Sequence, residues 1–472
     1  MAPRLIEALA TTGPMAEIFC DESVLQAMLD FEVALARAEA KVGVIPQSAA
    51  RAIAVAAKAS AFDCAKLAES TLRAGTPGIA VSKALTEVVQ SKDPAAAGFV
   101  HWGATSQDVA DTALVLLLKR ARPVLMRDLS RIGKALSRLS KQHKGTVMLG
   151  RTLLQAAPPI TFGLKAAGWL SAIRYGQEQL ERAFQDALVL QFGGATGTLA
   201  SLGQDADAVA EALAENLGLR LPEPPWHSRR DRLAMLVCNC GVLTGSLGKI
   251  ARDIALLMQN EVSEAFEAGG NGRGGSSAMP QKRNPIACSL ALASANRVPG
   301  LVASFLSAMI QEHERGVGGW QAEWPILSSV IQATALALES VAEVAEGLSV
   351  DSKRMRANIE NTQGRIFAER ASMLLAQKLG KDAAFKALEE AARDSAKEKK
   401  RLAEVLAKMP EAAEQLGPRV LRDLEISEQY LGSAERFRRA LLSDANTPER
   451  ASEERSKSSR RKQNSVKQKK ER

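Results

Sequence analysis

The sequence predicts an all-α fold built around a bundle of long helices. Hydrophobic residues make up 46% of the 472-residue chain but aromatic residues only 4%, a bias that favours helices over sheets. The clearest periodicity lies between residues 230 and 267, where apolar side chains recur at alternating spacings of four and three residues: Leu236, Cys240, Leu243, Leu247, Ile250, Ile254 and Leu257. This period keeps one apolar seam facing partner helices and predicts a left-handed supercoiled bundle.

The other long helices are predicted where similar apolar patterns recur. They span residues 107–143, about 158–187, 285–311 and 325–348, and shorter helices are expected before about His101 and after about Asp351. Beyond Leu257 the seam position becomes Glu261 and then Glu264. Helices this long present more apolar surface than one chain can cover, so we expect an oligomer.

Four domains follow from this pattern. They are an N-terminal helical domain (1–104), a central long-helix bundle (105–350), a C-terminal helical domain (351–446) and a basic tail (447–472). The tail has almost no apolar residues, which predicts disorder. It carries ten Lys/Arg against four Glu, so its +6 leaves about +3 of the formal +9 for the rest of the chain. Because the tail lacks interleaved aromatic residues, a nucleic-acid-binding or membrane-surface arm is only an alternative.

Cysteine content and apolar run lengths indicate the compartment. The five cysteines are odd in number and show no CxxC spacing, which suits buried thiols in a reducing cytosol. The N-terminus has no apolar core of signal-peptide length, and we expect no run that approaches a membrane span. The prediction is a soluble cytoplasmic protein.

The most informative segment is GGNGRGGSSAMPQKRNP, residues 269–285. Its five glycines predict a mobile lid, because glycine adopts backbone conformations that other residues resist. Asn284-Pro285 predicts a helix start, with a capping side chain followed by proline at the first helical position. The loop would bring Ser276, Ser277 and Lys282 to a helix N-terminus that favours anions, an arrangement that suits chemistry on a carboxylate.

Two other kinds of loop share features with this segment. A solvated Gly-Ser linker has the same composition. A phosphate-binding loop is excluded, because the run follows a helix rather than a strand and Lys282 is preceded by Gln281 where that motif requires glycine.

The end of this segment, GSSAMPQKRNP, closely resembles the signature loop of the fumarase/aspartase superfamily, written roughly G-S-S-x-M-P-x-K-x-N-P. The resemblance covers nearly all the chain up to about Leu442. It implies an all-α homotetramer with a twenty-helix core, in which each active site collects loops from three subunits. By this match Ser276 is the expected proton carrier, with Ser277 as the alternative, and Lys282 and Asn284 stabilise the developing negative charge.

HWGATSQD, residues 101–108, precedes the first long helix. Thr105 and Ser106 either cap that helix or offer hydroxyls to a ligand carboxylate at its N-terminus. In the superfamily the matching T-S-x-D segment binds a substrate carboxylate, with its histidine beside it. The resemblance therefore implies that His101, Thr105 and Ser106 bind substrate.

GRTLLQ, residues 150–155, resembles a second superfamily signature, G-R-T-H-x-Q. Leu153 stands where the superfamily has a histidine that helps to handle the proton given to the leaving group. Leucine neither transfers protons nor donates hydrogen bonds, so a reaction that needs a general acid there is disfavoured. Thr152 and Gln155 remain available for polar contacts with a ligand.

Three further segments carry polar residues near the bundle ends: FGGATGTLASLG (192–203), PWHSRRD (225–231) and HERGVGGWQAEWP (313–325). The first is structural by default. Arg315 in the third could grip a carboxylate through two parallel hydrogen bonds, or form a surface ion pair with Glu312 or Glu314. Together the three resemble the superfamily branch that contains bacterial 3-carboxy-cis,cis-muconate cycloisomerases. That branch also lacks the G-R-T-H-x-Q histidine and has tryptophan there, so Leu153 departs from it too.

No cofactor or metal is expected. The four histidines (His101, His143, His227 and His313) are not spaced with carboxylates or cysteines as a metal site needs, and no dinucleotide-binding fingerprint follows a strand.

The resemblance implies a cofactor-independent isomerase acting on a small di- or tricarboxylate. It would lactonise 3-carboxy-cis,cis-muconate to 4-carboxymuconolactone in the protocatechuate branch of the β-ketoadipate pathway. The alternatives are a preference for 3-sulfomuconate, an adenylosuccinate-lyase-like or other amine-releasing lyase, a non-catalytic structural member of the superfamily, and a nucleic-acid binder that uses the tail.

Overall fold

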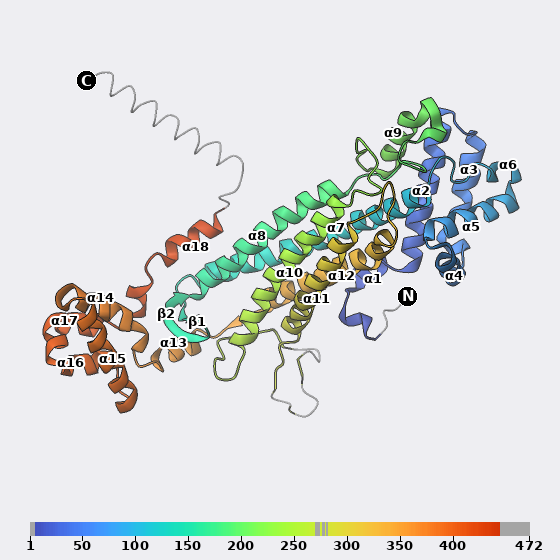
Figure 1. Ribbon diagram of the computed structural model, residues 1–472. Coiled ribbons are helices and arrows are strands. Elements are labelled where there is room, and N and C mark those ends of the chain that lie inside the picture. Colours follow the sequence, from blue (N-terminus) through green and yellow to red (C-terminus); the bar gives the residue numbers. More distant parts are fainter. Residues whose placement is uncertain (1–4, 270–273, 276–278, 280–281, 444–472) are drawn as a thin grey trace, which may run out of the picture. The chain divides into compact units, whose positions relative to one another are not determined.

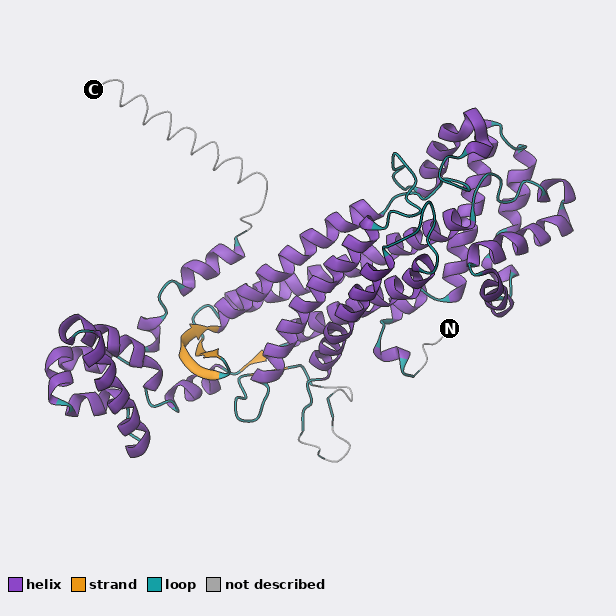
Figure 2. Ribbon diagram, viewed as in Figure 1, coloured by secondary structure: helices purple, strands orange, loops and turns teal. Residues whose placement is uncertain are grey.

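The computed structural model describes residues 5–269, 274–275, 279 and 282–443. It divides the chain into two compact units, each built from separate segments. Unit 1 comprises Met1–Ile132, Ile173–Arg252 and Arg273–Val344, and unit 2 comprises Gly133–Ala172, Asp253–Gly272 and Ala345–Arg472. Helices form nearly all of the regular structure (Figure 2), as the all-α prediction requires. The domain limits at residues 104, 350 and 446 stay a prediction.

The N-terminal part of unit 1 is a group of short and medium helices around α2 (Asp21–Val42). α2 buries twelve residues and ends at Gly43, whose φ of 98° is a conformation that glycine adopts without strain. The other helices of this group are α1 (Gly13–Ile18), α3 (Gln47–Ala56), α4 (Cys64–Ala74), α5 (Pro77–Lys92), α6 (Pro94–Ala97) and α9 (Ala206–Leu217). Short 3-10 helices η1 (Glu7–Leu9), η2 (Ala59–Ala61) and η3 (Ala200–Asp205) connect to them.

The five predicted long helices are present (Figure 1): α7 (Ser106–Gln142), α8 (Phe162–Ala187), α10 (Asp231–Leu257), α11 (Ile286–Ala308) and α12 (Gly319–Gly347). All seven residues of the predicted seam in α10 are buried, which confirms the periodicity. Glycines let neighbouring helices approach closely. A Cβ at Gly176 of α8 would lie 2.8 Å from Leu243, and one at Gly248 would lie 2.6 Å from Ala295 of α11.

Several predicted helix limits are wrong, for local reasons. α8 begins at Phe162, because residues 155–161 form a strand. α12 begins at Gly319, six residues before Pro325, so the helix tolerates the one backbone hydrogen bond that this proline cannot donate. α11 begins at Ile286 with Pro285 as its N-cap and no side-chain cap hydrogen bond, so Asn284 is not the cap.

Among the described residues, three helices are long and apolar enough to cross a membrane by length and composition: α10, α11 and α12. The expectation that no run approaches a membrane span is therefore wrong. The most apolar windows of α10 and α12 are 56% and 67% buried within the protein, so most of their apolar surface packs against other helices. The corresponding window of α11 is only 28% buried.

Unit 2 contains four short strands that the all-α prediction did not include. β1 (Val147–Thr152) pairs with β2 (Gln155–Thr161) as an antiparallel hairpin, and β3 (Ala265–Phe266) pairs with β4 (Ser349–Val350). Its C-terminal helices are α13 (Ser352–Glu360), α14 (Ala368–Leu379), α15 (Lys381–Glu398), α16 (Leu402–Lys408), α17 (Pro410–Asp423) and α18 (Ala434–Leu442), with 3-10 helices η4 (Arg365–Phe367) and η5 (Ser427–Tyr430). Residues of these helices form one apolar core with Val147 and Leu149 of β1.

Candidate active site

Asp108, in the first turn of α7, joins three of the sequence-selected segments in unit 1. Its fully buried carboxylate accepts hydrogen bonds from the backbone N–H groups of Gly193 (3.0 Å), Gly194 (2.9 Å) and Thr105 (3.0 Å). Nε2 of His227 lies 2.7 Å from Asp108 Oδ1. These hydrogen bonds replace the solvation that a buried carboxyl group loses. The glycine-rich turn and the PWHSRRD segment therefore hold the start of α7.

Arg315 adds the fourth segment to this cluster. Its Nη2 donates to Thr105 Oγ1 (2.6 Å) and to the backbone carbonyls of Gly194 (2.9 Å) and Ala195 (3.0 Å). Its Nε is buried and has no hydrogen-bond partner within the described part of the chain. Among those residues Arg315 forms no ion pair with Glu312 or Glu314. The guanidinium is held by neutral acceptors and keeps its positive charge uncompensated by a direct carboxylate.

The start of α7 uses its capping groups in an unusual way. Asp108 accepts the backbone N–H of Thr105, which is one half of a capping box. The hydroxyl of Thr105 is instead engaged by Arg315. Ser106 is the first helical residue, and its backbone packs so closely on α5 that a Cβ at Gly78 would lie 2.4 Å from the Ser106 carbonyl oxygen. The helix N-terminus thus has a hydroxyl and a guanidinium together at an end that favours anions.

His101 lies four residues before Thr105 and contacts α2. Its Nδ1 is 2.7 Å from Oε1 of the buried Glu32, and its φ of 61° is in the left-handed region. Burial lowers the pKa of the His101 imidazole, but the Glu32 carboxylate outweighs burial and leaves that pKa raised. The carboxylate thus makes the ring easier to protonate than an ordinary imidazole.

A second buried network supports the cluster. Arg230 donates two hydrogen bonds to Asp111 (2.7 and 3.0 Å), and its Nε lies 2.8 Å from Glu323 Oε2. Trp320 Nε1 also donates to Asp111, at 2.9 Å. Burial raises the pKa of Glu323 to about 7, although Arg230 opposes the rise. One buried cation thus faces two carboxylates, and it ties α7 to α12.

The roles of Asp108, Asp111, His227, Arg230 and Glu323 were not predicted from the sequence. One signal was available for two of them: Asp108 and Asp111 are three residues apart at the start of a helix, so they share one face of it, which is buried. Their partners are up to about two hundred residues away in the chain, and no local pattern identifies them.

Three other predicted residues lie on the β1–β2 hairpin of unit 2. Thr152 pairs with Gln155 across a two-residue turn formed by Leu153 and Leu154, which have φ of 50° and 64°. Two positive φ values are those of a type I′ turn, where glycine or asparagine is usual. Leu153 is 97% exposed and Leu154 74%. The chain thus presents two apolar side chains at the tip of a strained turn.

Glu264 holds the hairpin close to its turn. Arg151 donates to both of its carboxylate oxygens, at 2.9 and 2.7 Å, and Asn358 Nδ2 donates at 2.8 Å. The Glu264 side chain is fully buried. It lies between α10 and β3, immediately before β3, so it connects the hairpin to the segment that leads into the glycine-rich loop. The sequence pattern placed Glu264 on the seam but gave no partner.

The glycine-rich loop is only partly described. Ser276 and Ser277 lie outside the described residues. The backbone N–H of Lys282 donates to the Met279 carbonyl (3.1 Å), and that of Asn284 donates to Gly274 (2.9 Å), whose φ is +72°. No hydrogen bond or ion pair links Lys282 or Asn284 to Thr105 or Arg315 among these residues. The structure therefore brings Thr105 and Arg315 together, with His101 and Ser106 nearby in the chain, and among the described residues it shows no such contact for Lys282 or Asn284.

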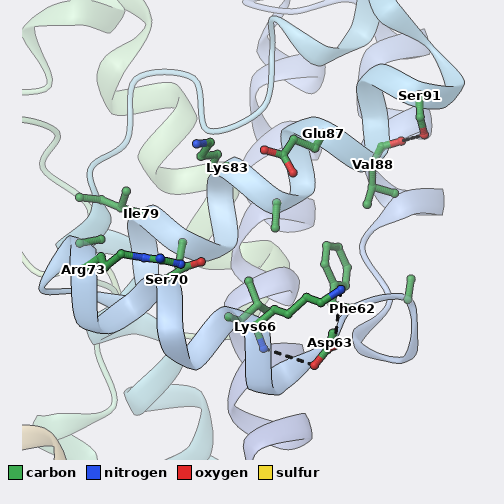
Figure 3. Close-up of a pocket in the computed structure, with 15 residues that line it drawn as sticks. Phe62, Asp63, Lys66, Ser70, Arg73, Ile79, Lys83, Glu87, Val88 and Ser91 are labelled. Atoms are coloured by element: carbon green, nitrogen blue, oxygen red, sulfur yellow. Dashed lines mark hydrogen bonds and ion pairs between the residues drawn. The ribbon is translucent and has the colours of Figure 1, made fainter.

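Figure 3 shows a groove of ≈ 780 Å³ between α4 and α5. Lys66, Arg73 and Lys83 line it together with Asp63 and Glu87, so its charges are mixed. None of the residues selected from the sequence lines this groove. The candidate site is therefore the Thr105–Arg315 cluster. In the part of the chain that the structure describes, no group of three or more His, Cys, Asp or Glu side chains is arranged to hold a metal ion.

Comparison with known proteins identifies the family. A family model described as lyase matches residues 7–300. The 3-carboxy-cis,cis-muconate cycloisomerase of Bradyrhizobium diazoefficiens is 47% identical over 431 residues, which cover 91% of this chain and 96% of the relative. Nitrosuccinate lyase of Streptomyces davaonensis is 41% identical over 438 residues, 91% of this chain and 92% of the relative.

A solved structure agrees with these relatives. The crystal structure of 3-carboxy-cis,cis-muconate lactonizing enzyme from Pseudomonas putida matches with a TM-score of 0.87 and 44% identity, over 93% of this chain and 98% of that one. The chain therefore belongs to the fumarase/aspartase superfamily of lyases, in its 3-carboxy-cis,cis-muconate cycloisomerase branch.

Proposed function

We propose that this chain is an intramolecular lyase that lactonises 3-carboxy-cis,cis-muconate to 4-carboxymuconolactone during aromatic-compound degradation. The observation that carries the proposal is the pairing of Arg315 with Thr105 at the N-terminus of α7. A fixed cation, a hydroxyl and a helix N-terminus together favour a carboxylate ligand. Relatives of this name cover almost the whole chain.

The reaction needs no protein nucleophile, because a carboxylate of the substrate attacks an alkene carbon of the same molecule. A C–O bond forms, and the electron pair of the alkene moves onto the remote carboxylate as an enediolate. Holding the diene folded so that these atoms meet is a proximity effect, which lowers the activation barrier. In well-oriented intramolecular reactions this effect reaches about 7–11 kcal/mol. The protein must then stabilise the enediolate and deliver one proton to the adjacent carbon.

We assign these two tasks to the glycine-rich loop. Lys282, Asn284 and backbone N–H groups of the loop stabilise the enediolate electrostatically. Ser276 delivers the proton, with Ser277 as the alternative. In the reverse direction the leaving group is a carboxylate, a weak base that needs little protonation. Leucine at position 153, in place of an acid histidine, is therefore compatible with this reaction and poorly compatible with amine release.

The proposed enzyme is a cytoplasmic homotetramer with a twenty-helix core and no cofactor. The apolar surface of α11 supports the assembly, because its most apolar window is only 28% buried within one chain. The exposed leucines at the β1–β2 turn give a second apolar surface. The loop and hairpin residues would then complete each site from other subunits. Light scattering after size exclusion should give four times the mass of the chain, and a monomer would contradict this assembly.

The function is tested by following the loss of diene ultraviolet absorbance when the purified protein meets 3-carboxy-cis,cis-muconate without added metal. Rapid turnover that is lost in a Ser276→Ala/Ser277→Ala double variant supports the proposal. No turnover of this substrate, with turnover of nitrosuccinate or adenylosuccinate instead, would replace it with an eliminating lyase. No turnover of any of them would favour a non-catalytic role.

A second candidate substrate follows from Leu153. An apolar side chain that replaces a larger aromatic residue leaves space beside the 3-substituent, and 3-sulfomuconate carries a bulkier tetrahedral sulfonate there. The ratio of kcat/KM for the two substrates decides between them. A markedly lower kcat/KM for the sulfonate rejects this candidate.

A further inference from the structure

Two glutamates on α2 are buried on the same side of the helix. Glu32 and Glu39 are seven residues apart, or two helical turns, and their side chains are 1% and 0% exposed. Oε1 of Glu32 is paired with Nδ1 of His101, while its Oε2 has no hydrogen-bond partner in the described part of the chain. Neither carboxylate oxygen of Glu39 has a partner there. Nothing in the proposed reaction uses either residue directly.

The two glutamates differ in their hydrogen-bond partners, and Glu39 is the one without any among the described residues. A buried carboxylate without partners is strongly disfavoured as an anion. Burial, with a further contribution from Glu32, raises the pKa of Glu39 to about 9. Glu39 therefore keeps its proton at neutral pH. Glu32, in contrast, has a hydrogen-bond partner in His101.

The contact with Glu32 determines which ring nitrogen of His101 carries a hydrogen and how the ring is oriented. Because Nδ1 faces a carboxylate oxygen at 2.7 Å, Nδ1 carries a hydrogen and the ring orientation is fixed. The charged groups that act on His101 are Glu32 from α2 and Asp108 from α7, and both favour the imidazolium. Nε2 is then left as the second donor of the ring, four residues from Thr105 in the chain.

We propose that Glu32 is a positioning residue that holds His101 in the orientation in which Nε2–H donates to a substrate carboxylate. The inference rests on the proposed function for the identity of that carboxylate. It adds to the candidate site a residue that contacts no substrate itself and lies on a helix that no sequence motif selected.

The matched variants Glu32→Gln and Glu39→Gln test it, because both remove a carboxylate from the buried side of one helix with the same substitution. E32Q should raise KM for 3-carboxymuconate about tenfold at pH 8, the effect of losing one charge-assisted hydrogen bond, with little change in kcat. KM of E32Q should recover toward wild type only below the pH at which the buried His101 of that variant becomes protonated. E39Q should leave KM and its pH dependence unchanged.

A second readout does not depend on turnover. In protein labelled at histidine Cε1, the His101 resonance, identified by its absence in His101→Gln, should titrate above the ordinary 6.5 in wild type and E39Q. In E32Q burial is opposed by Asp108 alone, so the resonance should titrate at a lower pH than in wild type. If the wild type titrates this way but does not turn over 3-carboxymuconate, the proposed function fails and the Glu32–His101 assignment stands.

Three outcomes would overturn the inference. They are a His101 titration in E32Q equal to that of wild type, a rise of KM in E32Q that is equal at all pH values, and a loss in E39Q as large as in E32Q. If E32Q does not fold, H101Q carries the test. Its KM should be raised and independent of pH between about 5.5 and 8.5, and a pH dependence like that of wild type would refute the role of His101.

Discussion

Replacing Arg315 by lysine keeps a positive charge in the loop before α12 but removes the planar donor group that spans Thr105 and the glycine-rich turn. In the structure one nitrogen, Nη2, donates to three acceptors at 2.6, 2.9 and 3.0 Å. A flexible ammonium cannot keep this geometry and also present a second face to a carboxylate. We therefore expect substrate binding, and not folding, to suffer.

The size of the effect follows from the contacts. A hydrogen bond to a charged group contributes about 1.5–3 kcal/mol. The three bonds share one nitrogen, so their energies are not summed, and the carboxylate contact adds one interaction of similar size. A loss of about 2–3 kcal/mol corresponds to a decrease in kcat/KM of roughly 30- to 150-fold, since 1.36 kcal/mol is tenfold. Most of it should appear as a raised KM.

The assay is steady-state loss of diene absorbance with 3-carboxymuconate, with thermal unfolding to verify the fold. Glu312→Gln is the matched control in the same loop, because Glu312 accepts a backbone hydrogen bond from the exposed Val317 and does not contact Arg315 through its side chain. E312Q should stay within threefold of wild type. An R315K enzyme with wild-type kcat/KM would refute the assignment of Arg315 as a carboxylate contact.

The remaining predictions concern positioning and stability. Glu264→Gln leaves Arg151 with a neutral partner. We expect kcat/KM to fall more than tenfold and the free energy of unfolding to fall by about 1–3 kcal/mol. Unchanged kinetics would show that the hairpin does not serve the site. A Cβ at position 248 would lie 2.6 Å from Ala295, and valine adds two further methyl groups there. Gly248→Val should therefore lower the free energy of unfolding, measured with denaturant, by about 1–3 kcal/mol. An unchanged free energy of unfolding would mean that the two helices separate freely. The pKa of Glu39 is raised from 4.5 to about 9, so the folded state binds more protons than the unfolded state between these values, and stability falls as pH rises, by up to about 1.4 kcal/mol per pH unit. E39Q should therefore gain stability relative to wild type at pH 9 compared with pH 5, and equal differences at both pH values would show that Glu39 is ionised in the folded protein.

The long helices could be predicted because their signal is local and repeated. The seam from Leu236 to Leu257 alternates spacings of four and three residues, and every member is buried. The β1–β2 hairpin was missed because Pro158 and Pro159 resemble a helix start, whereas Pro159 pairs with Leu149 in the strand. Strand pairing depends on a partner segment, which a local pattern does not show. The helical periodicity that begins at Phe162 also made the preceding strand resemble the first turn of that helix.

The candidate site could likewise be predicted only in part, where its residues belong to local motifs. Thr105 and Arg315 belong to motifs, and the structure gives them a direct contact. No sequence pattern identifies Glu32, because a buried glutamate of an apolar helix has the same sequence signal as a solvated one. Its role follows only from its contact with His101, which is 69 residues away in the chain. The roles of Arg230 and Glu323 likewise follow only from the buried ion pair that they form. Motifs indicate which side chains react, while the groups that orient them come from distant segments and require the fold.

The central claim is that the chain closes a lactone by internal addition and then protonates carbon. The most direct measurement is NMR and mass analysis of the product formed from 3-carboxy-cis,cis-muconate in D₂O. The account predicts one product, 4-carboxymuconolactone, with a single deuterium on the carbon next to the remote carboxylate. Unchanged substrate, a hydrated open-chain acid, or a lactone without deuterium at that carbon would contradict it.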